Sequence, residues 1–258
     1  MLPFGNKENV MWINRQVTMA KTRTGGPLAA AFVSLARLAA AFAAAGVNGA
    51  CAPLIQQAGS SEILVSIEPG EECLHRYSAL QKNPPQFAVW AERLDNSFGG
   101  TIFATRKAAT NGWAFSGGNT RKEALPVWTA KKAGEAVDAI AGATPRGPFA
   151  VAVAPKDGAA ERQFYLYVEL NHSTDFNAAY PEDAKEGEPG YSGGSAGSGQ
   201  PSIVYRCLVD LDGGPGGYTL TPIGHGSADG SDGLVDPDLS TLTSALRIVR
   251  SVTAELKP

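Results

Sequence analysis

The sequence predicts a mainly β protein, built as an antiparallel sandwich with long loops and a short helix near the C-terminus. Short segments in which apolar and polar residues alternate recur along the chain, and this pattern is typical of half-buried strands. Turn-forming residues separate them, since the 258 residues include 30 glycines and 17 prolines. That content favours tight turns over long helices. Many short strands spaced by turns indicate a sandwich.

The strands are expected in a regular order along the chain. The segment LDNSFGG (94–100) has the Asn, Asp and Gly residues of a hairpin turn, so 86–106 is expected to form a β-hairpin. A charged turn joins the fourth and fifth segments, and Gly213 and Gly214 lie within the turn between the sixth and seventh. The expected strands are 63–69, 86–92, 99–106, 151–154, 163–170, 201–211, 217–224 and 252–256.

Three further segments have a different pattern. Residues 107–147 have no clear periodicity and are expected to form an irregular excursion. Trp113 and Trp128 are expected to lie in the core or to seal the excursion onto the sheet, and the alternative is that they line a ligand cleft. Residues 182–200 are rich in Gly, Ser and acidic residues, which cannot bury apolar surface, so we expect a mobile loop. From Asp238 onward, leucines recur at helical spacing and predict the short C-terminal helix.

Residues 1–51 have the layout of an export signal. Lys21 and Arg23 precede an Ala-rich apolar run that ends in small residues, as in the basic, apolar and cleavage regions of a signal peptide. A start at Met19 would give a basic region of ordinary length. The alternative is a buried Ala-rich helix of the mature protein. A membrane-spanning helix is disfavoured because Arg37 divides the run into stretches shorter than the roughly 20 residues needed.

Cys51 is a candidate lipid anchor. Gly49 and Ala50 precede it, as small residues precede the modified cysteine of lipoproteins, although Asn48 stands where leucine is usual. We therefore expect a protein of the periplasm or cell envelope that is attached to the membrane through an N-terminal lipid. After the signal, residues 52–61 would form a tether and residues 62–258 the sandwich domain.

Charge and cysteine content limit the partners and the redox state. The net charge is −3 and the basic residues are scattered, which excludes a typical nucleic-acid-binding protein. Besides Cys51, the chain has Cys73 and Cys207. These two either form a disulfide in an oxidising compartment or remain separate half-buried thiols.

One short segment suggests a cofactor. VDAIAGATPRG (137–147) resembles the FMN-attachment motif in the flavin subunits of sodium-pumping and Rnf-type electron-transport complexes. The resemblance implies an FMN joined through a phosphoester to Thr144, with Gly142 and Asp138 in the motif and an electron-transport partner. Ala141 and Arg146 depart from the pattern, which has hydroxyl residues at both positions. The alternative, which these departures favour, is a tight turn between a strand and a loop.

A longer resemblance covers most of 62–256. The segments EALPVW (123–128) and DAIAGATP (138–145) resemble the EALPxW…DAxxGATP pattern of an uncharacterised group of bacterial predicted periplasmic proteins. The resemblance implies an Ig-like or fibronectin-like sandwich. It implies no particular activity.

Polar residues that could support chemistry lie in the segments 171–177 and 224–233. They are His172, Asp175, Asn177, His225, Ser227, Asp229 and Asp232. If the two loops meet, the histidines and acids could bind a divalent metal or serve a Ser/His hydrolase. There is no Gly-x-Ser-x-Gly elbow and no close pair of histidines. The alternative is that these side chains hold turns together by hydrogen bonds.

The leading functional hypothesis is therefore a non-enzymatic binding or accessory protein of the cell envelope, which presents loops from a rigid sandwich. One rival is an electron-transfer module with FMN on Thr144. The other is a metal-dependent enzyme or hydrolase that uses His172 and His225. The sequence names no ligand.

Overall fold

The computed structural model describes residues 62–76, 82–110, 112–113, 121–132, 140–142, 144–153 and 161–257. It confirms the mainly β, antiparallel, sandwich-like fold. The strands are β1 (Ile63–Pro69), β2 (His75–Arg76), β3 (Lys82–Asn83), β4 (Gln86–Glu92), β5 (Phe98–Thr105), β6 (Ile140–Gly142), β7 (Phe149–Val153), β8 (Gln163–Asn171), β9 (Ile203–Asp210), β10 (Gly216–His225) and β11 (Val249–Leu256). The helices are α1 (Arg106–Thr110) and α2 (Pro126–Lys131), with 3-10 turns η1 (Gly194–Ala196) and η2 (Ser244–Arg247).

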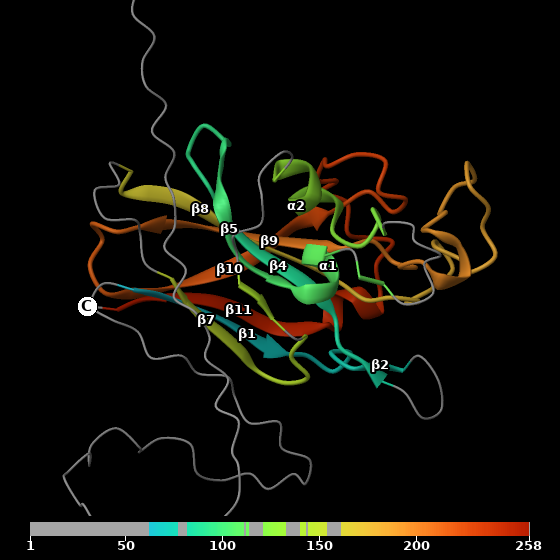
Figure 1. The fold of residues 1–258 in the computed structure, drawn as a ribbon, viewed down its shortest axis with the longest axis horizontal. Coiled ribbons are helices and arrows are strands. Elements are labelled where there is room, and N and C mark those ends of the chain that lie inside the picture. Colours follow the sequence, from blue (N-terminus) through green and yellow to red (C-terminus); the bar gives the residue numbers. More distant parts are fainter. Residues whose placement is uncertain are drawn as a thin grey trace, which may run out of the picture.

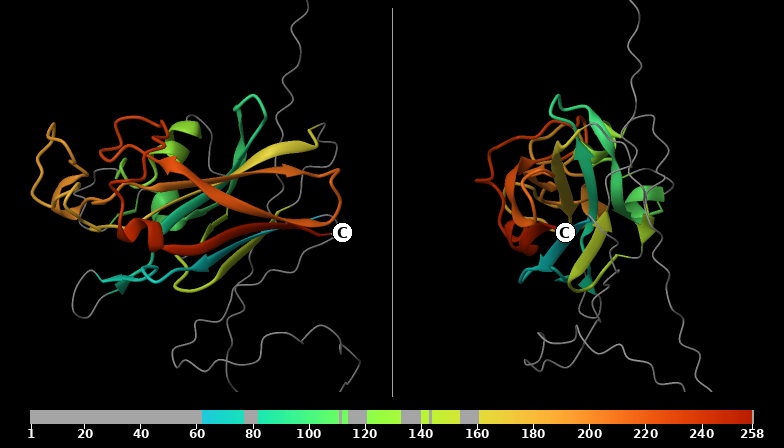
Figure 2. Two further views of the ribbon diagram at one scale, coloured as in Figure 1. Left: turned by 180° about the vertical axis from the view of Figure 1, so that it is seen from behind. Right: turned by 90° about the vertical axis from the view of Figure 1, so that its left-hand side faces the viewer.

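The main sheet has the strand order β6-β5-β4-β8-β9-β10-β11-β1-β7, while β2 and β3 pair separately. All neighbours in the main sheet are antiparallel except β5 and β6. The sheet curls so that its two halves face each other (Figures 1 and 2). Aromatic contacts between the two halves show this. The ring centroid of Phe149 on β7 lies 4.9 Å from that of Phe87 on β4 and 4.6 Å from that of Phe103 on β5.

Strand alternation builds the main core between the two halves. On β8, Phe164, Leu166, Val168 and Leu170 point into this core, because successive side chains of a strand face opposite sides. The outer face of the same half is covered by α1 and α2. There Trp90, Tyr167 and Trp128 form a second apolar cluster, so β4 is buried on both faces. Trp128 is buried in this cluster and so packs α2 onto the sheet, as expected. Its Nε1 donates to Thr101 Oγ1 at 3.0 Å.

Several strand predictions are confirmed, and one pairing is wrong. The hairpin β4–β5 and the pair β9–β10 form as expected. The strands β7 and β8, by contrast, do not pair with each other. Strand β7 pairs with β1, and β8 lies between β4 and β9.

Three irregular segments also differ from expectation. The excursion 107–147 contains α1, α2 and the parallel strand β6 in its described part. The last part of the segment 182–200 is packed rather than exposed: Ser192, Ser198 and Gln200 are buried, and the backbone N–H groups of Ser198 and Gln200 donate to the carbonyl oxygens of Ser192 and Asp175. The C-terminal helix shortens to the 3-10 turn η2, because β11 begins at Val249 and takes its place in the sheet.

Candidate functional site

At one end of the sheet, three connecting segments pack together: residues 121–125, residues 172–202 between β8 and β9, and residues 226–247 between β10 and β11. We call them the loop platform (at the right of Figure 1). Loops carried on the end of a rigid sheet are common places for binding residues. The polar candidates from the sequence lie in two of these three segments, except His225, which is the last residue of β10.

Arg121 contacts several side chains of the loop platform. Its guanidinium donates to Ser173 Oγ at 2.5 Å, to Ser198 Oγ at 2.9 Å and to Glu123 Oε1 at 2.9 Å. It also lies 4.7 Å from the centre of the Trp113 ring. The Arg121 and Glu123 side chains are only 10% and 7% exposed, so the pair is screened little by solvent. Arg121 therefore fixes the β8–β9 connection against the segment 121–125.

The same segment also contacts the β10–β11 connection. Gly230 has a φ of +68° and sits so close that an added Cβ would lie 2.4 Å from the Lys122 carbonyl carbon. Only glycine fits this approach and this backbone conformation without strain. The two loops that the sequence marked as a candidate site are thus joined through residues 121–123.

A second set of hydrogen bonds ties the β8–β9 connection to the start of η2. Gln200 Oε1 accepts from the Thr243 backbone N–H at 2.6 Å, and Gln200 Nε2 donates to Ser244 Oγ. The Ser244 hydroxyl donates in turn to Asp175 Oδ1. Asn171 Nδ2 donates to the Gln200 carbonyl oxygen at 3.0 Å. Asp175, a predicted site residue, is buried within this network and serves to hold the loops.

The other predicted residues of the 171–177 loop also have structural partners. His172 is buried, and its Nε2 lies 2.8 Å from the Glu72 carbonyl oxygen. Asn177 Oδ1 accepts from the backbone N–H groups of Ala179 and Tyr180, and its Nδ2 donates to the Thr241 carbonyl oxygen.

The 224–233 loop is held in a similar way. His225 Nδ1 lies 2.7 Å from the Gly226 carbonyl oxygen. Ser227 donates to Asp229 Oδ1 at 2.7 Å, and Asp232 Oδ1 accepts from the Leu234 backbone N–H. Hydrogen bonds to Asp229 hold the pKa of its carboxyl below the usual value, Ser231 first and Ser227 second. Within the described ranges, no three His, Cys, Asp or Glu side chains are grouped so as to hold a metal ion.

Glu169 on β8 is a residue that the sequence analysis did not single out. It is fully buried under the start of α2, where its carboxylate accepts from Val127 N, Trp128 N and Ser202 Oγ. Burial raises its pKa to about 7, against the opposing effect of these donors. An acidic residue within the otherwise apolar and aromatic strand QFYLYVEL was the available signal, because buried carboxylates are rare and usually have dedicated partners.

The predicted FMN site is described in part, since Asp138 lies outside the described residues. Thr144 is half-buried, and its hydroxyl shares hydrogen bonds with the Gln86 side chain at 3.0 and 3.3 Å. Gly142 on β6 packs on Phe103, where an added Cβ would lie 2.9 Å from Cε2 of the ring. Sheet packing therefore explains the glycine, and the engaged hydroxyl fits a structural turn better than a flavin attachment site.

Cys73 and Cys207 are free thiols in the structure. Cys207 on β9 lies opposite Leu166, whereas Cys73 follows Glu72, whose carbonyl lies beside His172. Because residues 166 and 172 lie roughly 20 Å apart along the chain, Cys207 and Cys73 are too far from each other to form a disulfide. Burial raises the pKa of both thiols, that of Cys207 to about 12, which makes them poor nucleophiles. Cys51 lies outside the described residues.

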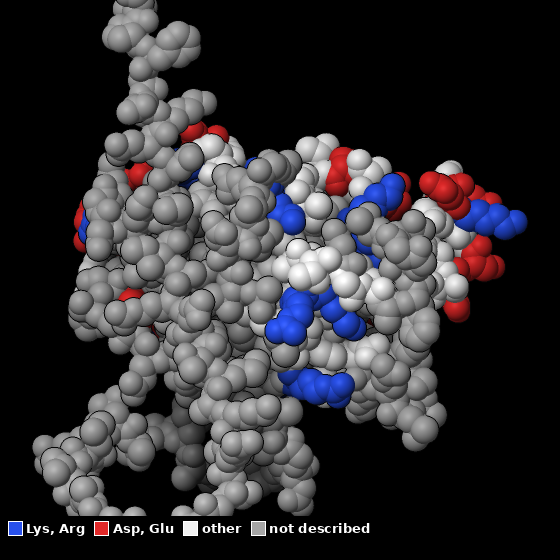
Figure 3. Space-filling view, in the orientation of Figure 1, with Lys and Arg blue, Asp and Glu red and all other residues white. Residues whose placement is uncertain are grey.

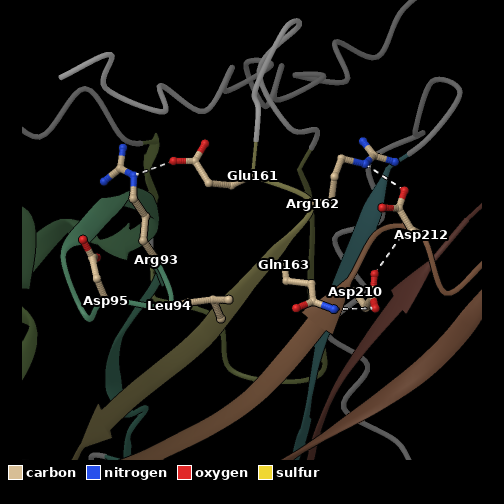
Figure 4. Close-up of a pocket in the computed structure, with 8 residues that line it drawn as sticks. All are labelled: Arg93, Leu94, Asp95, Glu161, Arg162, Gln163, Asp210 and Asp212. Carbon is tan, nitrogen blue, oxygen red and sulfur yellow. Dashed lines mark hydrogen bonds and ion pairs between the residues drawn. The ribbon is translucent and has the colours of Figure 1, made fainter. Parts of the chain in front are cut away.

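A shallow hollow of about 510 Å³ lies at the opposite end of the sheet (Figure 4). Its charged lining groups are engaged with one another: Arg93 pairs with Glu161 at 3.1 Å and Arg162 with Asp212 at 2.9 Å. Gln163 donates to Asp210 Oδ2 at 2.7 Å. Because its opposite charges already pair, the hollow presents no evident preference for a charged ligand.

Comparison with known proteins finds no matching family model, no matching curated protein and no matching solved structure. Among the described residues, no helix has the length and apolar character needed to cross a membrane.

Proposed function

We propose that this chain is an exported protein of the cell envelope, anchored by a lipid on Cys51, that acts as a non-enzymatic binding or accessory module through its loop platform. The observation that supports a binding role is the Arg121 network, which joins the loops into one pre-ordered surface. Binding to such a surface avoids most of the entropy loss of ordering loops. The support for export and anchoring is the sequence pattern of residues 1–51.

The geometry favours binding over catalysis at this end of the sheet. His172, Asp175, Asn177 and His225 all have contacts within the protein that position loops. The exposed side chains of the platform include apolar and acidic groups, together with a few basic ones. Leu234 is 73% exposed, and acidic side chains lie on the β8–β9 connection. Such a mixed apolar and polar surface suits a protein partner of the envelope.

Fractionation of cells tests the anchor. We expect the wild-type chain in the membrane fraction and Cys51→Ser in the soluble fraction, while the control Cys73→Ser stays with the membrane. Retention of Cys51→Ser in the membrane fraction would contradict the proposed anchor.

Site-specific photo-crosslinking tests the platform. A photoreactive residue in place of Leu234 should give a discrete crosslinked product in cells, whereas the same residue in place of the exposed Arg250 on β11 should not. Equal products from both positions, or none from position 234, would contradict binding through the platform.

A further inference from the structure

A group of basic side chains lies beside the open edges of the curled sheet, at the end from which the loop platform projects, because β5 ends beside the start of β4 and the start of β4 pairs with Asn171. Arg106 and Lys107 begin α1, which packs against β4, β5 and β6. Arg146 lies in the connection from β6 to β7, the two edge strands. All three side chains are exposed. We call these three residues the basic face.

The basic face is not neutralised by the described part of the chain. None of its three cations forms an ion pair there, whereas Lys131 on α2 is paired with Glu92. Figure 3 shows basic side chains over α1 and over the turn below it, with no acidic side chain between them among the coloured atoms. Unpaired exposed cations attract an anionic surface at distances up to about a Debye length, roughly 10 Å.

The opposite charge gathers at the loop platform. Glu182, Asp183, Glu186 and Glu188 are exposed on the β8–β9 connection, which projects at the right of Figure 3, and they outnumber the one exposed lysine among them, Lys185. The molecule therefore has a basic side and an acidic tip although its net charge is only −3. An anionic surface would attract the first and repel the second, and so would orient the domain.

We propose that the basic face contacts anionic phospholipid headgroups, so that the domain lies with α1 toward the bilayer. This rests on the proposed anchor on Cys51. The expected tether of residues 52–61 spans at most about 35 Å when extended. It therefore keeps the domain close enough to the bilayer for weak electrostatic contacts to act.

Vesicle sedimentation tests the proposal. The full chain is compared with the variant Arg106→Ala/Lys107→Ala/Arg146→Ala on phosphatidylcholine vesicles with and without phosphatidylglycerol. Each basic residue near an anionic surface strengthens binding about five-fold. We expect the variant to partition onto phosphatidylglycerol vesicles on the order of 100-fold more weakly than the wild type. The difference should vanish on pure phosphatidylcholine and at high salt.

The matched control removes three cations elsewhere, as Lys185→Ala/Arg250→Ala/Lys257→Ala. It should bind phosphatidylglycerol vesicles as well as the wild type does. Equal binding by the wild type and both variants would overturn the proposal, as would a loss that persists on phosphatidylcholine. The N-terminal apolar run is common to all these chains, and sedimentation of purified protein does not depend on lipidation. Fractionation of Cys51→Ser therefore tests the proposed lipid anchor, and vesicle sedimentation tests the proposed contact of the basic face with lipid, so each proposal can fail independently of the other.

Discussion

Ser202 donates its hydroxyl hydrogen to Glu169 Oε1 at 2.6 Å, and both side chains are fully buried. The same carboxylate accepts the backbone N–H groups of Val127 and Trp128. One acid thus joins β8, the residue before β9 and the start of α2. The segment 121–125 of the loop platform ends immediately before α2. The contact of Glu169 with the start of α2 therefore also supports the position of Arg121.

The stability of the protein should depend on the protonation of Glu169. Its folded-state pKa is about 7, above the usual 4.5, so the folded protein holds this proton more tightly than the unfolded chain does. The contribution to stability is therefore greatest below pH 4.5 and is lost as pH rises to about 7. The shift corresponds to about 3 kcal/mol. Urea unfolding at pH 5 and pH 8 should show this loss in the wild type, and a much smaller one in Glu169→Gln. The same pH dependence of the free energy of unfolding in the wild type and in Glu169→Gln would contradict this role of Glu169.

Gly226→Ala should destabilise the contact between the platform and Glu169. An added Cβ would lie 2.6 Å from Pro126 Cγ and 2.7 Å from Ser202 Oγ, so neighbouring atoms must move. We expect a loss of about 1–3 kcal/mol in the free energy of unfolding, measured with urea. Gly217→Ala on β10 is the control, because nothing lies within 4 Å of its added Cβ. Similar losses in the two variants would refute this explanation.

Arg121→Ala should be far more damaging than the loss of a surface arginine. It leaves Glu123, a side chain only 7% exposed, without its cation, at a cost of about 3–5 kcal/mol. Arg162→Ala should cost less than about 1 kcal/mol, because its pair with Asp212 is 52% and 65% exposed. Denaturation in urea measures both. Comparable effects would show that Arg121 does not hold the platform together.

Thr144 should not become flavinylated. Its hydroxyl is half-buried and hydrogen-bonded to Gln86, which leaves it poorly placed for a transferase. We expect the protein purified after coexpression with a flavin transferase to be colourless by absorption spectroscopy. Yellow colour that survives denaturation and disappears in Thr144→Ala would establish the opposite.

The sequence by itself determined the local elements of the fold. Alternation in ILVSIEP predicted β1 with the bounds that the structure has, because one buried face imposes a period of two. The segment QFAVWAE predicted β4 with its bounds as well, although this strand is buried on both faces. The turn LDNSFGG likewise determined the β4–β5 hairpin, since its residues favour the required backbone conformations.

Only the tertiary structure decided which elements meet. The contact of Phe149 with Phe87, the burial of Glu169 under α2 and the reach of Arg121 to Ser198 each join residues distant in sequence. Local patterns do not encode such pairs, because they depend on how the whole sheet curls and on which faces it covers. For the same reason His172 and Asp175 looked like site residues in the sequence. In the folded chain both side chains make hydrogen bonds that hold the loops.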